Sequence, residues 1–165
     1  MKVLLLVRHA KSSWDDITMK DFDRPLNERG KKDAPEMAER VKEHGVKLTH
    51  FVSSPAKRAR RTARFFAEAF GAEKDDIQIV EALYEPTMQA FADAVAALPD
   101  DQDAVAFFSH NPTITDYVNS LSNVRVDDMP TCAVFAVSMD EKSWSAFASA
   151  DKQFLFFDYP KNPMG

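Results

Sequence analysis

The sequence predicts an α/β protein: a three-layer α/β/α sandwich around a mostly parallel mixed sheet, with no large cap domain. Two observations predict this class. Short apolar runs of strand length alternate with longer amphipathic stretches from residue 2 to about residue 121, which is typical of strands and helices in a parallel sheet. From residue 132 onward, apolar segments are separated only by short polar turns, which favours a meander of antiparallel strands at the end of the chain.

The segments that we expect to form strands are short, apolar and bounded by polar or turn-forming residues. They are residues 2–7, 49–53, 77–80, 104–109, 132–139, 143–148 and 153–157. The first is apolar at almost every position, as expected for a strand that is buried on both faces. Residues 140–142 and 151–152 are expected to form the turns between the last three strands.

Four amphipathic segments are expected to form helices. Asn27 is suited to cap a helix that runs to about residue 44, where Gly45 is a typical stop. Pro35 inside this segment should bend the helix or shift its start. Ser54 followed by proline is a typical N-cap for a second helix that runs to about residue 70. The other two helices are expected over residues 88–98 and from about residue 112 to about residue 121.

Length and composition favour one globular domain over residues 1–165. The 165 residues are 45% apolar and 28% charged, as in proteins with a single continuous core. The one cysteine, Cys132, lies in an apolar run and is expected to be a small buried side chain. No segment resembles a secretion signal or a membrane span, so we expect the chain to act in the reducing cytoplasm without a membrane partner.

The formal net charge of −5 is unevenly distributed along the chain. Residues 1–64 carry 16 basic and 9 acidic residues, whereas the remainder is strongly acidic. An acidic protein lacks the extended basic face that nonspecific nucleic-acid binding requires, so nucleic acid is not an expected partner. The basic amino-terminal part favours a local anion site instead, although many of these charges are suited to solvated helix faces.

Three polar sequences occur where expected strands end. Arg8 and His9 follow the first strand, the segment Ser-Ser-Pro-Ala-Lys-Arg that ends at Arg58 begins at the end of the second, and His110 follows residues 104–109. Ligands of open α/β sheets bind in the crevice at the carboxyl ends of the strands. Arginine also presents a planar fork that matches phosphate oxygens. The sequence therefore predicts a phosphate site formed by these four side chains.

The same segments resemble the histidine phosphatase superfamily, which includes the cofactor-dependent phosphoglycerate mutases. The sequence Arg-His-Ala at residues 8–10 resembles its R-H-G/A signature, residues 53–63 resemble its S-S-P-x-x-R-A-x-x-T-A segment, and Ser109-His110 resembles its late strand-end histidine. All three occur in family order. Within the superfamily, the short length and the sequence of residues 8–12 resemble the bacterial SixA-type phosphohistidine phosphatases.

The resemblance implies an enzyme that hydrolyses phosphoric monoesters or phosphohistidine through a phosphohistidine intermediate on His9. A neutral imidazole is an adequate nucleophile near pH 7. Phosphoryl transfer then requires alignment and positive charge around the equatorial oxygens, which Arg8, Arg58 and a protonated His110 would supply. Neither a metal nor a cofactor is implied. Vanadate, tungstate and phosphate are expected to inhibit.

The general acid is less clearly indicated. The Leu-Tyr-Glu sequence that ends at Glu85 resembles the segment that supplies a carboxylic acid in several phosphatases of the superfamily. Between apolar neighbours and near phosphate, Glu85 would have a raised pKa and could protonate a leaving group. The alternative is a surface glutamate before the turn at Pro86.

Other polar residues near the first strand are candidates for substrate binding. Arg24 either contacts substrate or pairs with Asp23 or Glu28, and Lys11 either binds substrate or is solvated. Trp14 is either an aromatic side chain at the rim of the site or a packing residue. The two histidines outside the motifs, His44 and His50, are expected to be structural.

Three other functions are compatible with parts of the pattern. A metal hydrolase would need histidine spacings that the chain lacks, and Arg8 with Arg58 would repel a dication. The remaining two are a non-catalytic phosphate-binding module and a mutase. Only 24 residues separate Glu85 from His110, which leaves little chain for a lid. An open site favours a phosphorylated protein, in particular a phosphohistidine domain, or a range of small phosphate esters.

Overall fold

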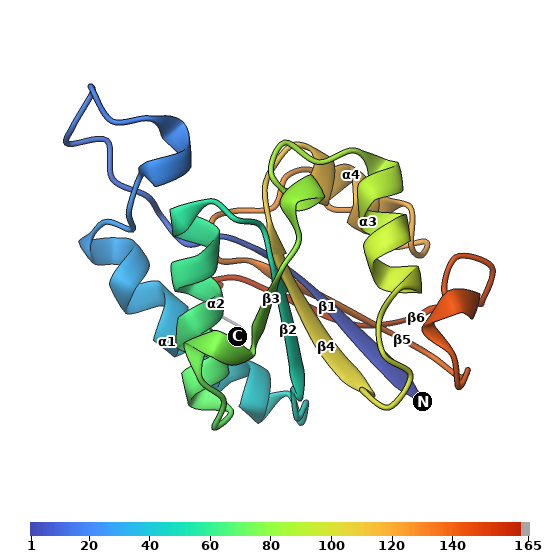
Figure 1. Cartoon of the computed structure of the whole chain (residues 1–165). Coiled ribbons are helices and arrows are strands. Elements are labelled where there is room, and N and C mark those ends of the chain that lie inside the picture. Colours follow the sequence, from blue (N-terminus) through green and yellow to red (C-terminus); the bar gives the residue numbers. More distant parts are fainter. Residues whose placement is uncertain (163–165) are drawn as a thin grey trace.

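The computed structural model describes residues 1–162, and its centre is one six-stranded sheet (Figure 1). The strands lie in the order β3-β2-β4-β1-β5-β6. β1 to β4 run parallel, whereas β5 is antiparallel to β1 and β6 is antiparallel to β5. The bounds are Lys2–Arg8 for β1, His50–Ser53 for β2, Ile77–Ile79 for β3, Ala104–Ser109 for β4, Val134–Met139 for β5 and Gln153–Asp158 for β6.

Helices cover both faces of this sheet. The bounds are Glu28–Glu43 for α1, Lys57–Ala69 for α2, Met88–Ala96 for α3 and Thr113–Asn119 for α4. α1 and α2 pack together on one face, and α3 and α4 lie on the other (Figure 1). The predicted three-layer α/β/α sandwich with a mostly parallel mixed sheet and no large cap is therefore confirmed.

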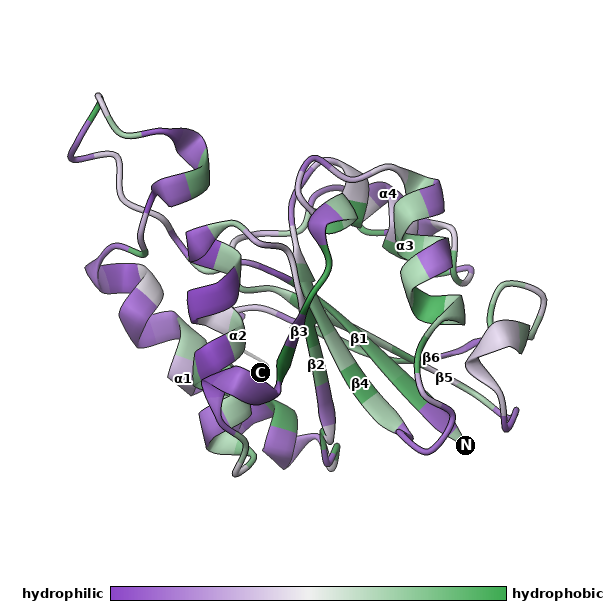
Figure 2. Ribbon diagram, viewed as in Figure 1, coloured by the Kyte–Doolittle hydropathy of each residue, from purple (hydrophilic) through white to green (hydrophobic). Residues whose placement is uncertain are grey.

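The central strand β1 divides the apolar core into two layers. Leu4 and Leu6 pack in the cluster under α3 and α4, whereas Leu5 and Val7 pack in the cluster under α1 and α2. This alternation follows from the two-residue period of a strand. Figure 2 shows the apolar strands between the helices, of which α1 and α2 carry many hydrophilic residues. Burial on both faces explains why the sequence of β1 is continuously apolar.

α1 begins where the sequence predicted, because the Asn27 side chain accepts a hydrogen bond from the Gly30 amide at 2.8 Å. The helix continues through Pro35 from Glu28, so the expected shift of its start does not occur. Gly30 lies against the loop after β1: a Cβ there would stand 2.2 Å from the carbonyl oxygen of Lys11. Only glycine permits this approach of helix and loop.

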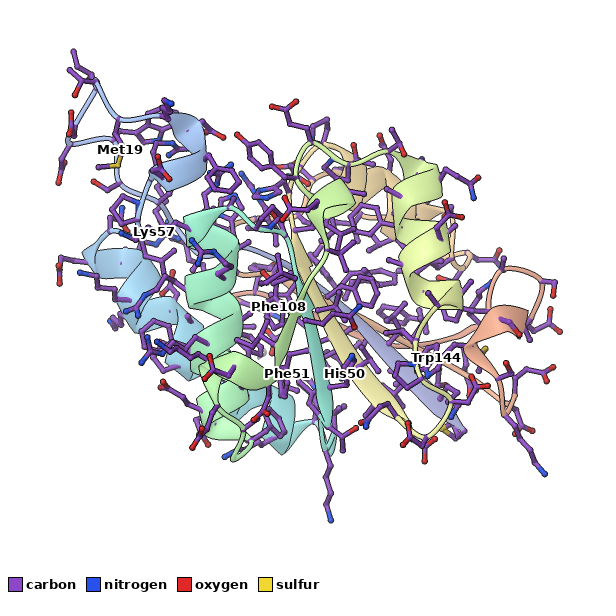
Figure 3. The ribbon with its side chains drawn as sticks, in the orientation of Figure 1. Met19, His50, Phe51, Lys57, Phe108 and Trp144 are labelled. Carbon is purple, nitrogen blue, oxygen red and sulfur yellow. The ribbon has the colours of Figure 1, made fainter. Side chains whose placement is uncertain are left out.

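One predicted strand is wrong. Residues 143–148 do not join the sheet; Trp144–Ala146 form a 3₁₀ turn instead. The Trp144 side chain is buried, and its indole donates to the carbonyl oxygen of Gln102 at 2.7 Å (Figure 3). Its backbone amide donates to the Asp100 carboxylate at 2.9 Å. Docking of the indole at the end of the sheet thus overrides the strand preference of the segment, and β5 and β6 form a simple antiparallel pair.

Candidate active site

The parallel strands bring the predicted phosphate ligands to one edge of the sheet. Arg8 pairs in register with Ser109, so the residues that follow them, His9 and His110, emerge side by side. Their ring centroids are 5.2 Å apart. They open into a pocket of about 230 Å³, which is lined by Arg8, His9, Lys11, Ser12, Trp14, Arg24, Arg58, His110, Asn111 and Thr131. The structure thus brings together all the predicted site residues except Glu85.

His9 is held in one tautomer. Its side chain is buried, with 7% of its surface exposed, and Nδ1 lies 2.8 Å from the Ala10 carbonyl oxygen. A carbonyl oxygen only accepts, so Nδ1 carries the proton and Nε2 keeps its lone pair. Arg58 Nε donates toward Nε2 at 3.3 Å. Burial lowers the pKa of His9 to about 3, and the imidazole is therefore neutral at physiological pH.

Arg58 enters the pocket from the first turn of α2. Its Nη1 donates to the Asp21 carbonyl oxygen at 2.7 Å, and its Nη2 contacts the Asp21 carboxylate at 3.0 Å. Thr62, one turn later, accepts from the Ala10 amide at 2.9 Å and donates to the Arg58 carbonyl oxygen at 2.8 Å. Thr62 therefore ties α2 to the backbone beside His9, which fixes the arginine relative to the imidazole.

Ser54 does not cap α2 as predicted, because the helix starts at Lys57 with Ala56 as its N-cap. The Ser54 hydroxyl accepts from the Ala56 amide at 3.1 Å, which forms a tight turn before the helix. The same hydroxyl lies 2.7 Å from His110 Nε2. The role of Ser54 is thus to orient His110 while it shapes the entry to α2.

Two buried nitrogen atoms at the site have no hydrogen-bond partner among residues 1–162: Arg8 Nε and His110 Nδ1. Arg8 is anchored by its Nη1, which donates to the Met129 carbonyl oxygen at 2.8 Å. Buried polar atoms are normally satisfied, so these two are suited to bind the oxygens of an anion. Burial, followed by the charge of Arg58, lowers the pKa of His110 to about 3. His110 is therefore neutral in the unliganded site, and its expected protonation beside a phosphoryl group stays a prediction.

Arg24 lies inside the pocket rather than at the protein surface. Its guanidinium contacts the Asp21 carboxylate at 2.9 Å, donates to Ser12 and stacks on Trp14 at 3.6 Å. Trp14 is 67% exposed, so of its two predicted roles the structure favours the rim aromatic. The expected ion pairs of Arg24 with Asp23 or Glu28 do not form. Lys11 lines the pocket with an exposed side chain, as a substrate-binding role would require.

Glu85 does not line the pocket. Its side chain is exposed, so the expected apolar surroundings are absent, and its backbone has a φ of +50°. The neighbouring Tyr84 turns toward the site instead, with its ring edge-on to His110 at 5.7 Å between centroids. The structure favours a surface glutamate, and the role of Glu85 as general acid stays a prediction.

The sequence interpretation missed Asp21, which connects the two sides of the site. Its carboxylate accepts from Arg58, from Arg24 and from the Tyr84 hydroxyl, the last at 2.8 Å. Burial opposes ionisation of Asp21, but the hydrogen bond from Tyr84 and the two arginines outweigh it and lower the pKa of the carboxyl. No sequence signal identifies this aspartate, because it lies in a polar loop with three other acidic residues.

The remaining histidines lie away from the pocket, as expected. His44 stacks on Phe156 with centroids 3.8 Å apart and contacts the buried Asp158 carboxylate at 3.1 Å. His50 contacts Gln78 at 3.1 Å on the neighbouring strand. Cys132 is buried, as predicted. Among residues 1–162, no helix has the length and apolar composition that a bilayer span requires.

The protein is an α/β protein whose pocket, at the carboxyl ends of parallel strands, contains two histidines flanked by arginines. The sequence model of the histidine phosphatase superfamily (branch 1) matches residues 4–91, more than half of the chain. The protein therefore belongs to the histidine phosphatase superfamily.

Solved structures with this fold include SixA proteins. A putative phosphohistidine phosphatase SixA from Agrobacterium tumefaciens superposes with a TM-score of 0.79 over 96% of this chain and 98% of its own, at 23% identity. A protein histidine phosphatase SixA in complex with tungstate gives the same TM-score over 96% of this chain and 97% of its own, at 22% identity. These similarities show that the protein shares the SixA fold.

Two curated proteins are also similar to this chain in sequence. An uncharacterised chloroplastic protein of Arabidopsis thaliana is 27% identical over 154 residues, which cover 88% of this chain and 70% of its own. A probable phosphoglycerate mutase, GpmB of Escherichia coli, is 37% identical over 75 residues, or 44% of this chain. The matched segment spans about a third of the mutase, or 34% of its length.

Proposed function

We propose that this protein is a phosphatase that accepts the phosphoryl group on His9 and then transfers it to water, with phosphohistidine in a protein as its physiological substrate. The observation that carries the proposal is the state of His9. The imidazole is neutral, its Nδ1–H is fixed on the Ala10 carbonyl, and its Nε2 lone pair lies on the side of Arg58. This is the state that a histidine nucleophile requires.

The reaction has two displacements. Nε2 of His9 attacks phosphorus, a P–N bond forms, and the bond to the leaving group breaks as that group takes a proton. Water then attacks the phosphohistidine, which releases inorganic phosphate and restores the neutral imidazole. Arg8, Arg58 and His110 Nδ1 hold the equatorial oxygens in both steps. The negative charge of the bound phosphate raises the pKa of His110 and favours its protonation.

The substrate class follows from the shape and polarity of the pocket. It is small and lined mostly by polar side chains, so it suits a phosphoryl group more than a large organic substituent. A phosphohistidine leaving group is easily protonated and depends little on a positioned acid. A substrate that does not need a positioned acid is consistent with Glu85 facing solvent outside the pocket. The second candidate is a phosphomonoesterase of broad specificity, which the same open rim would permit.

The test is a substrate comparison combined with trapping of the intermediate. Purified protein is assayed on a phosphohistidine-containing domain, a phosphoserine peptide, sugar phosphates and an aryl phosphate, with and without a chelator. We expect the phosphohistidine domain to give the highest kcat/KM, with no effect of the chelator and with inhibition by tungstate. Acid-labile, alkali-stable phosphate should appear on His9. Preference for a sugar phosphate would favour the second candidate, and absence of all turnover would indicate a binding module.

A further inference from the structure

A second cavity of about 470 Å³ lies on the outer side of α2, separate from the active-site pocket. It is bounded by α2, by the 3₁₀ turn Lys74–Asp76 and by β3 at the edge of the sheet. Its lining residues are Lys57, Arg60, Arg61, Arg64, Lys74, Asp75, Ile77 and Ile79. None of them lines the active-site pocket. We call this cavity the basic groove, because five of its eight lining residues are cationic.

The basic groove and the active site lie on different faces of one helix, α2. The four α2 cations of the groove stand at positions i, i+3, i+4 and i+7, and so occupy one face of the helix. The other face of α2 is buried and carries Arg58 into the pocket. Lys57, labelled in Figure 3, directly precedes Arg58 in the chain, so the groove begins at the turn of α2 that supplies the site arginine. The first turn of α2 therefore contributes one side chain to the groove and the next one to the pocket.

Most of the positive charge in the groove is uncompensated. Arg64 contacts the Glu68 carboxylate at 3.0 Å. Within residues 1–162, no carboxylate lies within 4.0 Å of the charged groups of Lys57, Arg60, Arg61 or Lys74. Arg60 uses only its Nε internally, to donate to the Pro55 carbonyl oxygen at 2.8 Å. The Arg61 guanidinium lies over the Phe65 ring, 5.5 Å from its centroid, which does not neutralise its charge. These cations are therefore suited to bind carboxylates of a partner.

The floor of the groove is apolar. Ile77 is half-buried and Ile79 is 41% exposed, and both belong to β3. Among the strands within residues 1–162, β3 pairs with β2 alone and forms the edge of the sheet. An apolar floor beside a cationic wall suits a polypeptide that carries acidic residues and an aliphatic side chain.

The dimensions of the groove favour a protein over a nucleic acid. The helix cations from Lys57 to Arg64 extend over only about 10 Å, at 1.5 Å per residue. The groove then reaches a turn with two exposed aspartates, Asp75 and Asp76, which would repel a continuing phosphate backbone. Nucleic-acid binding requires a longer basic surface, and the chain carries a net charge of −5. A short acidic peptide segment matches both the length of this cationic stretch and its positive charge.

We propose that the basic groove docks an acidic segment of a phosphorylated protein substrate while the phosphorylated side chain of that protein enters the active-site pocket. This proposal rests on the proposed phosphatase function. Docking outside the pocket would give specificity for a protein substrate that the small open site alone does not provide. It would act on KM, because the groove does not contact the reacting atoms.

The test uses two phosphohistidine peptides and an aryl phosphate. One peptide carries four Asp or Glu residues beside the phosphohistidine, and the other carries Asn and Gln in their place. The groove variant is Arg60→Glu with Arg61→Glu, and the matched control is Lys32→Glu with Lys47→Glu, which makes the same charge change at exposed positions of α1 and of the segment before β2. At low salt the natural protein should prefer the acidic peptide by about tenfold in kcat/KM, a preference that salt screens.

The groove variant should lose this preference through a higher KM for the acidic peptide. Its kcat/KM on the aryl phosphate and on the neutral peptide should stay within about twofold of the natural protein's values, because neither substrate forms ion pairs with the groove. The control and the conservative variant Arg60→Lys with Arg61→Lys should keep it. Equal loss on all three substrates, or no preference in the natural protein, would overturn the docking proposal. So would tighter binding of a single-stranded oligonucleotide than of the acidic peptide.

Binding of the unphosphorylated acidic peptide, followed by fluorescence anisotropy, separates this proposal from the proposed function. If the peptide binds the natural protein and not the groove variant, yet its phosphorylated form is not hydrolysed, the docking surface stands and the proposed substrate is wrong. If the phosphopeptides are hydrolysed equally and neither binds through the groove, the phosphatase stands and the docking surface is wrong.

Discussion

The floor and the rim of the active-site pocket are built differently. The floor consists of Arg8, His9, Arg58 and His110, which lie on or directly after regular elements and are held by backbone hydrogen bonds or buried partners. The rim comes from the loops after β1 and β3, and its side chains are held mainly by contacts with one another around Asp21.

This difference indicates a division of roles. Positions fixed by the sheet suit groups that must align with a phosphoryl group to within fractions of an ångström. Loop positions suit groups that select the substrate, because their side chains move without disturbing the strands. Substitutions in the floor should therefore reduce kcat strongly, and substitutions in the rim should have smaller effects that depend on the substrate.

The largest effect is expected from removing the nucleophile. His9→Ala deletes the side chain that we propose as the acceptor of the phosphoryl group, so turnover should fall by at least about 10³-fold. Circular dichroism should show an unchanged fold, and no phosphoenzyme should be trapped after acid quench. Residual activity above a few per cent would mean that another residue, or water directly, attacks the substrate.

The next effect concerns the arginine that bridges floor and rim. Arg58→Ala should lower kcat/KM by about 10²-fold or more, because it removes a charge that stabilises the transition state. Arg58→Lys should recover only part of this loss, since lysine cannot contact His9 and Asp21 at once. Steady-state kinetics on an aryl phosphate measure both variants. Equal activity of the lysine variant and the natural protein would contradict the need for the guanidinium fork.

The buried histidines of the floor should make the fold sensitive to acid. Burial lowers the pKa of both His9 and His110 from 6.5 to about 3, so the unfolded chain binds protons between these values that the folded protein does not. The contribution of the two neutral imidazoles to the free energy of unfolding is therefore fully present above pH 6.5, and it is lost as the pH decreases below that value. The slope approaches about 1.4 kcal/mol per pH unit for each histidine.

Urea unfolding between pH 4.5 and pH 7.5 measures this slope. His110→Gln should reduce this slope by the share of one histidine, which is about 1.4 kcal/mol per pH unit at most. His50→Gln serves as the control, because His50 lies away from the pocket and its substitution leaves both buried imidazoles in place. An unchanged slope in the His110 variant would show that its imidazole is protonated in the folded protein.

Asp21 tests the rim. Asp21→Asn removes the carboxylate that holds Arg58 and Arg24, so we expect kcat to fall by about five- to tenfold, an effect typical of lost positioning. Anion affinity should not weaken, because the substitution also removes a negative charge from the pocket. The inhibition constant for tungstate, measured beside kcat, separates these effects. A parallel loss of tungstate affinity would assign Asp21 a direct part in holding the anion site together.

The smallest effect is expected at Glu85. Glu85→Gln should change kcat/KM by less than about threefold on both phosphohistidine and an alkyl phosphate, because the side chain faces solvent outside the pocket. A general acid contributes about 10²–10⁴-fold when the leaving group is poor. A loss of that size on the alkyl phosphate alone would restore Glu85 as the general acid.

The floor was predictable from the sequence, whereas the rim was predictable only in part: Lys11, Trp14 and Arg24 were candidates and line the pocket, but Asp21, which holds the rim together, was missed. Arg8, His9 and His110 follow apolar runs that can only be strands, and parallel strands bring their carboxyl ends to one edge of a sheet. Asp21 lies in a loop whose path depends on tertiary contacts, so no pattern marks it. Tyr84 has no sequence signal of its own, and the left-handed backbone at Glu85, with a φ of +50°, is not marked by a glycine that the sequence would reveal.

The fold was predictable to a similar degree. Apolar periodicity located every strand of the sheet to within about two residues at each end. The wrong strand prediction around Trp144 has a physical cause. The buried indole needs a hydrogen-bond acceptor and finds it in the Gln102 carbonyl oxygen, a tertiary contact that local strand preference does not reveal.

The ends of the loop that forms most of the rim meet closely. Ser12 bridges Leu26, the Ser13 amide donates to the Pro25 carbonyl oxygen at 2.8 Å, and the Asn27 amide donates to the Lys11 carbonyl oxygen at 3.0 Å. Residues 14–24 thus form a loop whose two ends are held together by hydrogen bonds, while its tip lies away from the rest of the fold. In Figure 3, Met19 in this loop lies far from the sheet. Extra chain inserted there adds little closure entropy and leaves the nucleophile in place. This fold can therefore acquire a lid at a single point of insertion.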